Sequence, residues 1–306
     1  GRRGRPAPRS QPDGTARVIH QNTGEPARTC LQQGQTGHHG CTASAGIAER
    51  YPDFIRHGMH IITPNKQANS GCINKYRKIR QLTRQNKRQF LYETTVCAGL
   101  PIMTTLQDII NTGDTVIEIQ GVVSGSLNYI FHQLNQQVPF SNAVKQAKEL
   151  GYSEPDPRED LSGRDVARKM ITLARELDID IDLSQLDYLN LVPDSLRELS
   201  SNDFLQQLES FDSQFQQELE TIKGDHPSIA YVGKINLQQR SVNIGLEPLS
   251  AQHPFAGLNG TDNMVIFKTE RYKQQPLIVR GPGAGAEVTA SGIFADLLRL
   301  TSSLTQ

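Results

Sequence analysis

The chain has 306 residues, enough for one large domain or two ordinary ones with a sizeable core. Its 32 Lys and Arg residues balance 32 Asp and Glu residues, so the net charge gives no reason to expect a nucleic acid or an anionic membrane as partner. No apolar run reaches the ~18–20 residues that span a bilayer, and the first residues lack the apolar core of a signal peptide. We therefore expect a soluble, cytoplasmic protein.

The four cysteines are widely spaced and form no CxxC pair. This spacing indicates neither a zinc site nor a disulfide framework, and we expect reduced thiols. His38 and His39 are adjacent, but neighbouring side chains of an extended segment point apart, so they are weak evidence for a metal site.

Residues 1–40 are rich in Arg, Gly, Gln, Pro and Thr and contain few large apolar side chains. Such a composition cannot bury much surface, so it predicts a disordered tail. Four arginines among the first nine residues could contact nucleic acid. A short solvated tail is the favoured interpretation.

From residue 41 onward, helical and strand patterns alternate. We expect a helix over 45–58, a short strand over 60–62, a solvated basic helix face within 68–90, and helices through 106–110, from 127, and over 141–150. Residues 115–120 alternate in the manner of a half-buried strand.

Residues 151–169 contain the densest set of charged and turn-forming side chains. Pro155 and Pro157 predict an ordered, non-helical loop, and a helix should begin near residue 162 or 163. On that helix Asp165 and Lys169 are four residues apart and share one face. Together with a loop carboxylate they could bind an ammonium group while the lysine exchanges a proton. The alternative, which spacing alone favours, is a surface ion pair that contributes ~0.3–0.5 kcal/mol.

The last third of the chain begins with an acid-rich connection. Residues 203–222 predict one long amphipathic helix, because their apolar side chains recur at helical spacing. Strand-like runs follow at 229–235, 242–246, 264–269 and 277–279, which we expect to form a mixed sheet, and residues 288–304 predict a final amphipathic helix.

Five stretches resemble the homoserine dehydrogenases, especially the dehydrogenase half of bifunctional aspartokinase–homoserine dehydrogenases. In chain order they are Thr63-Pro-Asn-Lys66, Tyr92-Glu-Thr-Thr-Val-Cys-Ala-Gly-Leu-Pro101, Gly121-Val-Val-Ser-Gly-Ser-Leu-Asn-Tyr-Ile130, GYSEPDPREDLSGRDVARK at 151–169, and Gly281-Pro-Gly-Ala-Gly-Ala-Glu-Val-Thr-Ala290. The resemblance covers the chain from about Cys41 to its end.

The resemblance implies an α/β fold: a truncated doubly wound nucleotide-binding domain followed by a mixed α+β substrate and dimerisation domain. The expected divisions are a disordered tail unrelated to the family at 1–40, a remnant of the NAD(P)-binding domain at 41–100, the substrate-binding and dimerisation domain at 101–284, and a helix at 285–306 that packs back on the nucleotide domain. The family's GxGxxG turn, whose backbone approaches the cofactor pyrophosphate, does not occur before Cys41.

By resemblance, the reaction is the NADP- or NAD-dependent interconversion of L-homoserine and L-aspartate 4-semialdehyde in threonine, methionine and isoleucine biosynthesis. Lys169 would exchange the proton, with Lys66 as the rival for that role. The resemblance implies three further sets of residues: substrate contacts at Gly151, Glu154, Asp160 and Asp165; cofactor contacts at Thr42, Lys66 and Gly285; and a monovalent cation, sodium, at Glu93, Val96, Ala98 and Leu100.

Each assignment has an ordinary structural alternative. Thr42 could be a helix cap without a cofactor role, Lys66 could be a solvated loop lysine, and Glu93 could be a buried acceptor of backbone N–H groups. For the whole chain, the expectation is a homodimer or higher homo-oligomer that acts on a small molecule. The alternative is an inactive fragment, or a non-catalytic dimerisation or homoserine-binding partner, because the phosphate-binding turn is missing.

Overall fold

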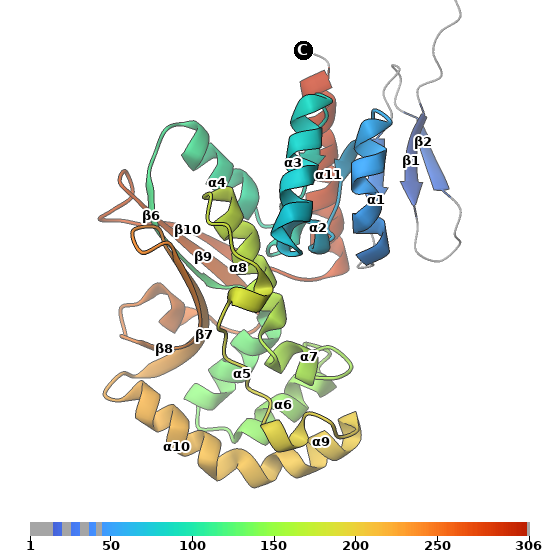
Figure 1. Cartoon of the computed structure of the whole chain (residues 1–306). Coiled ribbons are helices and arrows are strands. Elements are labelled where there is room, and N and C mark those ends of the chain that lie inside the picture. The colour runs from blue at the N-terminus through green and yellow to red at the C-terminus, as the bar shows by residue number, and fades with distance from the viewer. Residues whose placement is uncertain (1–14, 20–25, 31–36, 41–44, 305–306) are drawn as a thin grey trace, which may run out of the picture.

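Two five-stranded sheets organise the protein in this computed structural model, which describes residues 15–19, 26–30, 37–40 and 45–304 (Figure 1). The first sheet has the order β2-β1-β3-β4-β5, with β1, β3, β4 and β5 parallel and β2 antiparallel to β1. Its strands are β1 (Thr15–Ile19), β2 (Pro26–Cys30), β3 (Gly37–Gly40), β4 (His60–Ile62) and β5 (Phe90–Leu91).

The second sheet has the order β10-β9-β6-β7-β8, and every neighbouring pair in it is antiparallel. Its strands are β6 (Val116–Val122), β7 (Ser228–Asn236), β8 (Ser241–Leu249), β9 (Asp262–Thr269) and β10 (Leu277–Pro282). The predicted α/β class is confirmed. The expectation of a mixed second sheet is wrong, because each of its connections returns the chain in the opposite direction.

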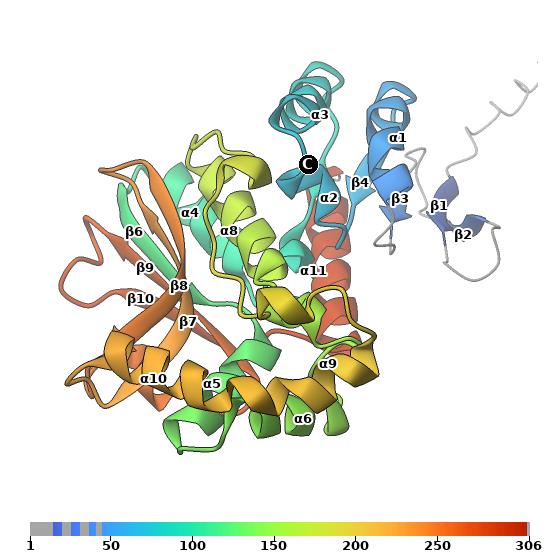
Figure 2. The same ribbon diagram turned by 60° about the horizontal axis from the view of Figure 1, so that its bottom comes forward.

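The helices divide between the two sheets (Figures 1 and 2). Near the first sheet lie α1 (Ala45–Arg56), α2 (Gln67–Ser70), α3 (Ile73–Gln85) and the C-terminal α11 (Ala286–Leu304). The others are α4 (Ile102–Asn111), α5 (Gly125–Asn135), α6 (Phe140–Glu149), α7 (Arg158–Leu161), α8 (Arg164–Glu176), α9 (Ser201–Gln207) and α10 (Asp212–Lys223). Among the described residues, no helix is both long and apolar enough to cross a membrane.

Three ranges within the predicted disordered tail are strands, namely β1, β2 and β3. They extend the first sheet from β4, so their backbone groups gain ladder partners that composition could not predict. The rest of residues 1–40 lies outside the described residues, and the domain divisions stay predictions.

The single helix expected over 203–222 is wrong, because a 3₁₀ turn at Leu208–Phe211 separates α9 from α10. The bend brings the start of α10 onto α6. There the carboxylate of Asp212 accepts hydrogen bonds from the backbone N (2.8 Å) and Oγ (2.7 Å) of Ser141, and Phe215 stacks on Phe140 with ring centroids 4.0 Å apart. These long-range contacts stabilise a break that helical periodicity alone does not reveal.

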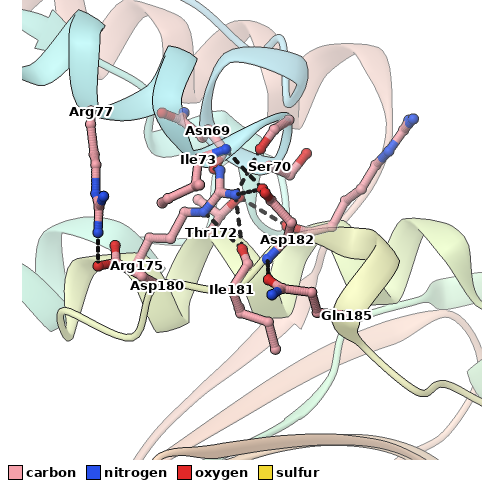
Figure 3. Close-up of polar contacts among 12 residues, drawn as sticks. Asn69, Ser70, Ile73, Arg77, Thr172, Arg175, Asp180, Ile181, Asp182 and Gln185 are labelled. Carbon is pink, nitrogen blue, oxygen red and sulfur yellow. Dashed lines mark hydrogen bonds and ion pairs between the residues drawn. The ribbon is translucent and has the colours of Figure 1, made fainter.

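Helix α8 connects the two parts of the molecule, since it packs on β7 and β8 on one side and on α2 on the other. Its buried Arg175 makes the connection (Figure 3). The guanidinium donates to the carbonyl oxygens of Asn69 (2.6 Å) and Gly71 (2.7 Å), and it pairs with Asp182 Oδ1 at 2.9 Å. Asp182 Oδ1 also accepts from the backbone N of Ile73, at the start of α3. One side chain thereby joins α8 to α2 and α3.

We predict that Arg175→Ala lowers the free energy of unfolding by roughly 3 kcal/mol, because it leaves the carbonyls of Asn69 and Gly71 without their donor and removes the ion pair with Asp182. Urea denaturation measures this. The matched control is Arg77→Ala, which removes an exposed ion pair with Asp180 at the same junction. The control should change stability by less than ~0.5 kcal/mol, and equal effects of the two substitutions would contradict this role of Arg175.

Candidate active site

A cleft of ≈ 1680 Å³ is lined by segments from both parts of the molecule. The loop after β4 contributes Lys66, the start of α5 contributes Ser126, and the segment between α6 and α8, together with the first turns of α8, contributes most of the charged side chains. Further lining comes from residues 94–98, the segment after α8, the start of β9 and the glycine-rich segment between β10 and α11. The stretches that the sequence singled out therefore meet at one place.

Asp165 lies between two lysines in this cleft. Its Oδ1 is 2.6 Å from Lys66 Nζ, and its Oδ2 is 2.8 Å from Lys169 Nζ. The second contact is the i,i+4 pair that helical spacing predicts, whereas the first joins residues 99 positions apart. Lys169 is only 7% exposed and also donates to the carbonyl oxygen of Val123 at 2.6 Å, so this pair is not a solvated surface ion pair.

These charges change the protonation of both partners. Burial alone would raise the pKa of the Asp165 carboxyl, but Lys169 and Lys66 outweigh it and hold that pKa far below its ordinary value. Burial alone would lower the pKa of the Lys169 amine, yet Asp165 opposes this and the net effect is a raised pKa. Lys169, which lines the cleft, therefore carries an ammonium group at neutral pH.

Two further carboxylates lie beside the pair. Asp160 accepts hydrogen bonds from Ser126 Oγ (2.7 Å) and from the backbone N of Glu154 (2.8 Å). Burial raises the pKa of Asp160, and burial together with the Asp160 charge raises the pKa of Glu154. Carboxylates whose pKa values are raised gain from a cation placed among them, so this corner of the cleft suits an ammonium group.

The segment that carries these acids is less irregular than expected. The short helix α7 follows Pro157, in a stretch that the prolines had predicted to be non-helical. Proline is tolerated at a helix start, and Asp156 Oδ1 accepts a hydrogen bond from the backbone N of Arg158 there (3.1 Å). Helix α8 then begins at Arg164, after Gly163 in the left-handed conformation with φ 70°.

The remaining expected contacts have different outcomes. Gly151 (φ 71°) and Gly285 (φ 116°) both line the cleft in backbone conformations that favour glycine. Thr42 lies outside the described residues. Lys66 is not the solvated loop lysine of the alternative interpretation, since it reaches Asp165 across the cleft.

Glu93 is buried, and its carboxylate is already engaged. Oε1 accepts from the backbone N of Met103 (2.8 Å), Oε2 accepts from the backbone N (3.1 Å) and hydroxyl of Thr104, and Arg299 lies 3.3 Å from Oε2. The carboxylate thus caps the start of α4, as the structural alternative predicted. With these donors in place the carboxylate has little capacity left for a cation, and within the described residues no three His, Cys, Asp or Glu side chains group as metal ligands. The monovalent cation site stays a prediction.

Sequence reasoning missed three residues in or beside the cleft. Val123, next to the lining residue Ser124, contributes its carbonyl to Lys169. Cys97 is buried with a positive φ of 58°, and Asn263 stands at the start of β9 with its Nδ2 3.3 Å from Cys97 Sγ. No motif marks Asn263. The positive φ of Cys97 could not be read from its residue type.

The fold and the cleft define a class. An α/β protein with a largely parallel sheet, joined to an antiparallel sheet across a cleft in which a buried lysine pairs with an aspartate, has the organisation of a two-part dehydrogenase. The family model described as "Homoserine dehydrogenase" matches residues 101–298, and the model described as "Homoserine dehydrogenase, NAD binding domain" matches residues 40–93. The chain belongs to the homoserine dehydrogenase family.

Comparisons with individual proteins agree with this family membership. A chloroplastic bifunctional aspartokinase/homoserine dehydrogenase 1 of Zea mays is 47% identical over 86% of this chain, which spans 29% of that relative's length. A homoserine dehydrogenase of Emericella nidulans is 39% identical over 86% of this chain and 74% of its own length. A crystal structure of a Candida auris protein of unknown function superposes with a TM-score of 0.84 at 37% identity, covering 92% of this chain and 83% of the other. The chain thus spans under a third of the plant bifunctional relative and most of the monofunctional one.

We predict that Asp165→Asn lowers the pKa of the Lys169 amine, because the carboxylate is the main group that raises it against burial. Titration of the lysine Nζ resonance by ¹⁵N NMR measures this pKa. Asp194→Asn removes an exposed carboxylate paired with Arg197 and should leave the Lys169 titration unchanged. An unchanged Lys169 pKa in Asp165→Asn would show that another group sets its charge.

Proposed function

We propose that the chain catalyses reversible hydride transfer between a nicotinamide cofactor and the pair L-homoserine and L-aspartate 4-semialdehyde. The observation that carries this proposal is the Asp165 carboxylate between Lys66 and Lys169, in a cleft with two further acids. Membership of the homoserine dehydrogenase family supports the substrate pair. No observation favours the inactive alternative.

The acids are proposed to bind the substrate ammonium. Glu154, Asp160 and Asp165 line one side of the cleft, and the first two have raised pKa values that a bound cation would lower. Asp160 is already oriented by Ser126 Oγ. Gly151, where the chain leaves α6 with a positive φ, leaves room for substrate because it has no side chain.

Lys169 is proposed to donate its ammonium proton to the carbonyl oxygen in reduction and, as the neutral amine that this donation leaves, to accept the alcohol proton in oxidation. Its raised pKa keeps the donor form present over the whole neutral range, and Asp165 and Val123 O hold its Nζ in place. Lys66 contacts the other oxygen of Asp165 and is proposed to position that carboxylate. It stays the rival for the proton-transfer role.

The cofactor supplies or accepts the hydride, and NADP and NAD remain equal candidates. Lys66, Gly285 and Thr42 are proposed as its contacts. A β-carbon on Gly285 would meet no atom within 4 Å, so the cleft is open there and a backbone close to a ligand is feasible.

For the monovalent cation, the Glu93 carboxylate has little capacity left. Its ligands would be the backbone carbonyls of Val96, Ala98 and Leu100 beside the left-handed turn at residues 97–98.

We predict turnover of aspartate 4-semialdehyde with NADPH or NADH, measured as loss of absorbance at the reduced cofactor's band. Lys169→Ala should lower kcat by at least ~10²-fold, because general acid catalysis contributes ~10²–10⁴-fold. Lys273→Ala removes an exposed lysine outside the cleft and is the control. Wild-type rates in Lys169→Ala would remove it from the mechanism.

A folded wild type without turnover would favour the inactive alternative. Isothermal titration then separates the remaining cases. Homoserine binding without cofactor binding indicates a non-catalytic binding partner, and binding of neither indicates a fragment.

A homodimer is also proposed, with the second sheet as the contact surface. β10 is an edge strand of that sheet, and its Ile278 is 42% exposed. We predict a mass of about twice the 33.9 kDa of one chain in light scattering after gel filtration. Ile278→Lys should shift the mass toward one chain, whereas Ile222→Lys, equally exposed on α10, should not. A wild-type mass of one chain would contradict the proposal.

The cytoplasmic location stays a prediction.

A further inference from the structure

Two buried polar atoms in the cleft lining have no hydrogen-bond partner. They are Oδ1 of Asn263, a residue that is 1% exposed, and Oγ1 of Thr94, a residue that is 6% exposed. Among the described residues, four other buried side-chain atoms share this condition, and none of their residues lines the cleft. A buried polar group without a partner is unfavourable, so these two atoms call for a ligand or ordered water.

Asn263 lines the same cleft as Lys169, the proposed proton donor. Its Nδ2 contacts Cys97 Sγ at 3.3 Å, and Cys97 also lines the cleft. The unpartnered acceptor is therefore in the cleft that holds the group proposed to exchange the proton.

Two glycines pack closely against these side chains. A β-carbon on Gly283, in the segment between β10 and α11, would lie 2.1 Å from Asn263 Nδ2, and one on Gly292, within α11, would lie 2.4 Å from Thr94 Cγ2. Neither position accommodates a larger residue unless these side chains move. The close packing restricts Asn263 and Thr94, so their free polar atoms have little freedom to find partners elsewhere.

We propose that Asn263 and Thr94 form the subsite for the carboxamide of the nicotinamide ring. A primary carboxamide has N–H donors for Asn263 Oδ1 and a carbonyl that accepts from the Thr94 hydroxyl. A substrate carboxylate would be repelled by the Asn263 acceptor, and the substrate ammonium already has three carboxylates. Holding the carboxamide would fix which face of the ring is turned toward the substrate beside Lys169. The inference rests on the proposed function.

The test measures dissociation constants of NADPH and NADH by fluorescence titration in the wild type, Asn263→Leu and Thr94→Val. Both substitutions nearly preserve shape and remove the polar atom. We expect each to weaken binding of the preferred cofactor about tenfold, the loss of one hydrogen bond. Binding of 2′,5′-ADP or ADP, which lack the nicotinamide, should not change.

Two controls separate the outcomes. Ser228→Ala removes an unpartnered buried hydroxyl outside the cleft and should bind cofactor like the wild type. The 3-acetylpyridine analogue lacks the N–H donors, so Asn263→Leu should not weaken its binding, whereas Thr94→Val should. If Asn263→Leu does not fold, Thr94→Val carries the test.

Unchanged cofactor affinity in folded variants, with a wild type that binds cofactor, would overturn the subsite alone and assign the two atoms to water. A wild type that binds neither cofactor would overturn both the subsite and the proposed function.

Discussion

A single carboxylate shared by two lysines determines how this site is assembled. Asp165 receives Lys169 from its own helix and Lys66 from the loop after β4, so the contact forms only when the two parts of the molecule lie in their observed places. About three turns further along α8, Arg175 joins the same two parts through backbone carbonyls. Helix α8 is thus held at both ends to the part of the molecule that contains the first sheet. Asp165 and Lys169, which α8 carries, are positioned by these contacts.

The charges around Asp165 assign separate roles to neighbouring groups. Lys169 is buried beside one carboxylate and one carbonyl, so it keeps its proton at neutral pH. Burial raises the pKa values of Glu154 and Asp160, and neighbouring carboxylates add to this, so a cation placed beside them would be bound favourably. A substrate with one ammonium and one reducible carbonyl matches the proposed division, in which the ammonium would meet the acids and the carbonyl would meet Lys169.

The sequence predicted what depends on local periodicity. The strand over 60–62 is found at those residues, and the 165/169 pair lies on one helix face as its spacing requires. The resemblance to the family, rather than spacing, selected the buried interpretation of that pair. Contacts between distant residues were out of reach, including Lys66 with Asp165 and Arg175 with Asn69. The break between α9 and α10 was missed for the same reason, because the contacts that stabilise it come from Ser141 and Phe140 of another helix.

The most direct test of the account is the transfer of deuterium from reduced cofactor labelled at C4 of the nicotinamide to aspartate 4-semialdehyde, with mass spectrometry of the product. Labelling each of the two C4 positions in separate samples identifies the face that reacts. The account predicts homoserine with a single deuterium on the new alcohol carbon, from only one of the two labelled cofactors. Unlabelled homoserine from both, or no homoserine from a folded protein, would contradict it.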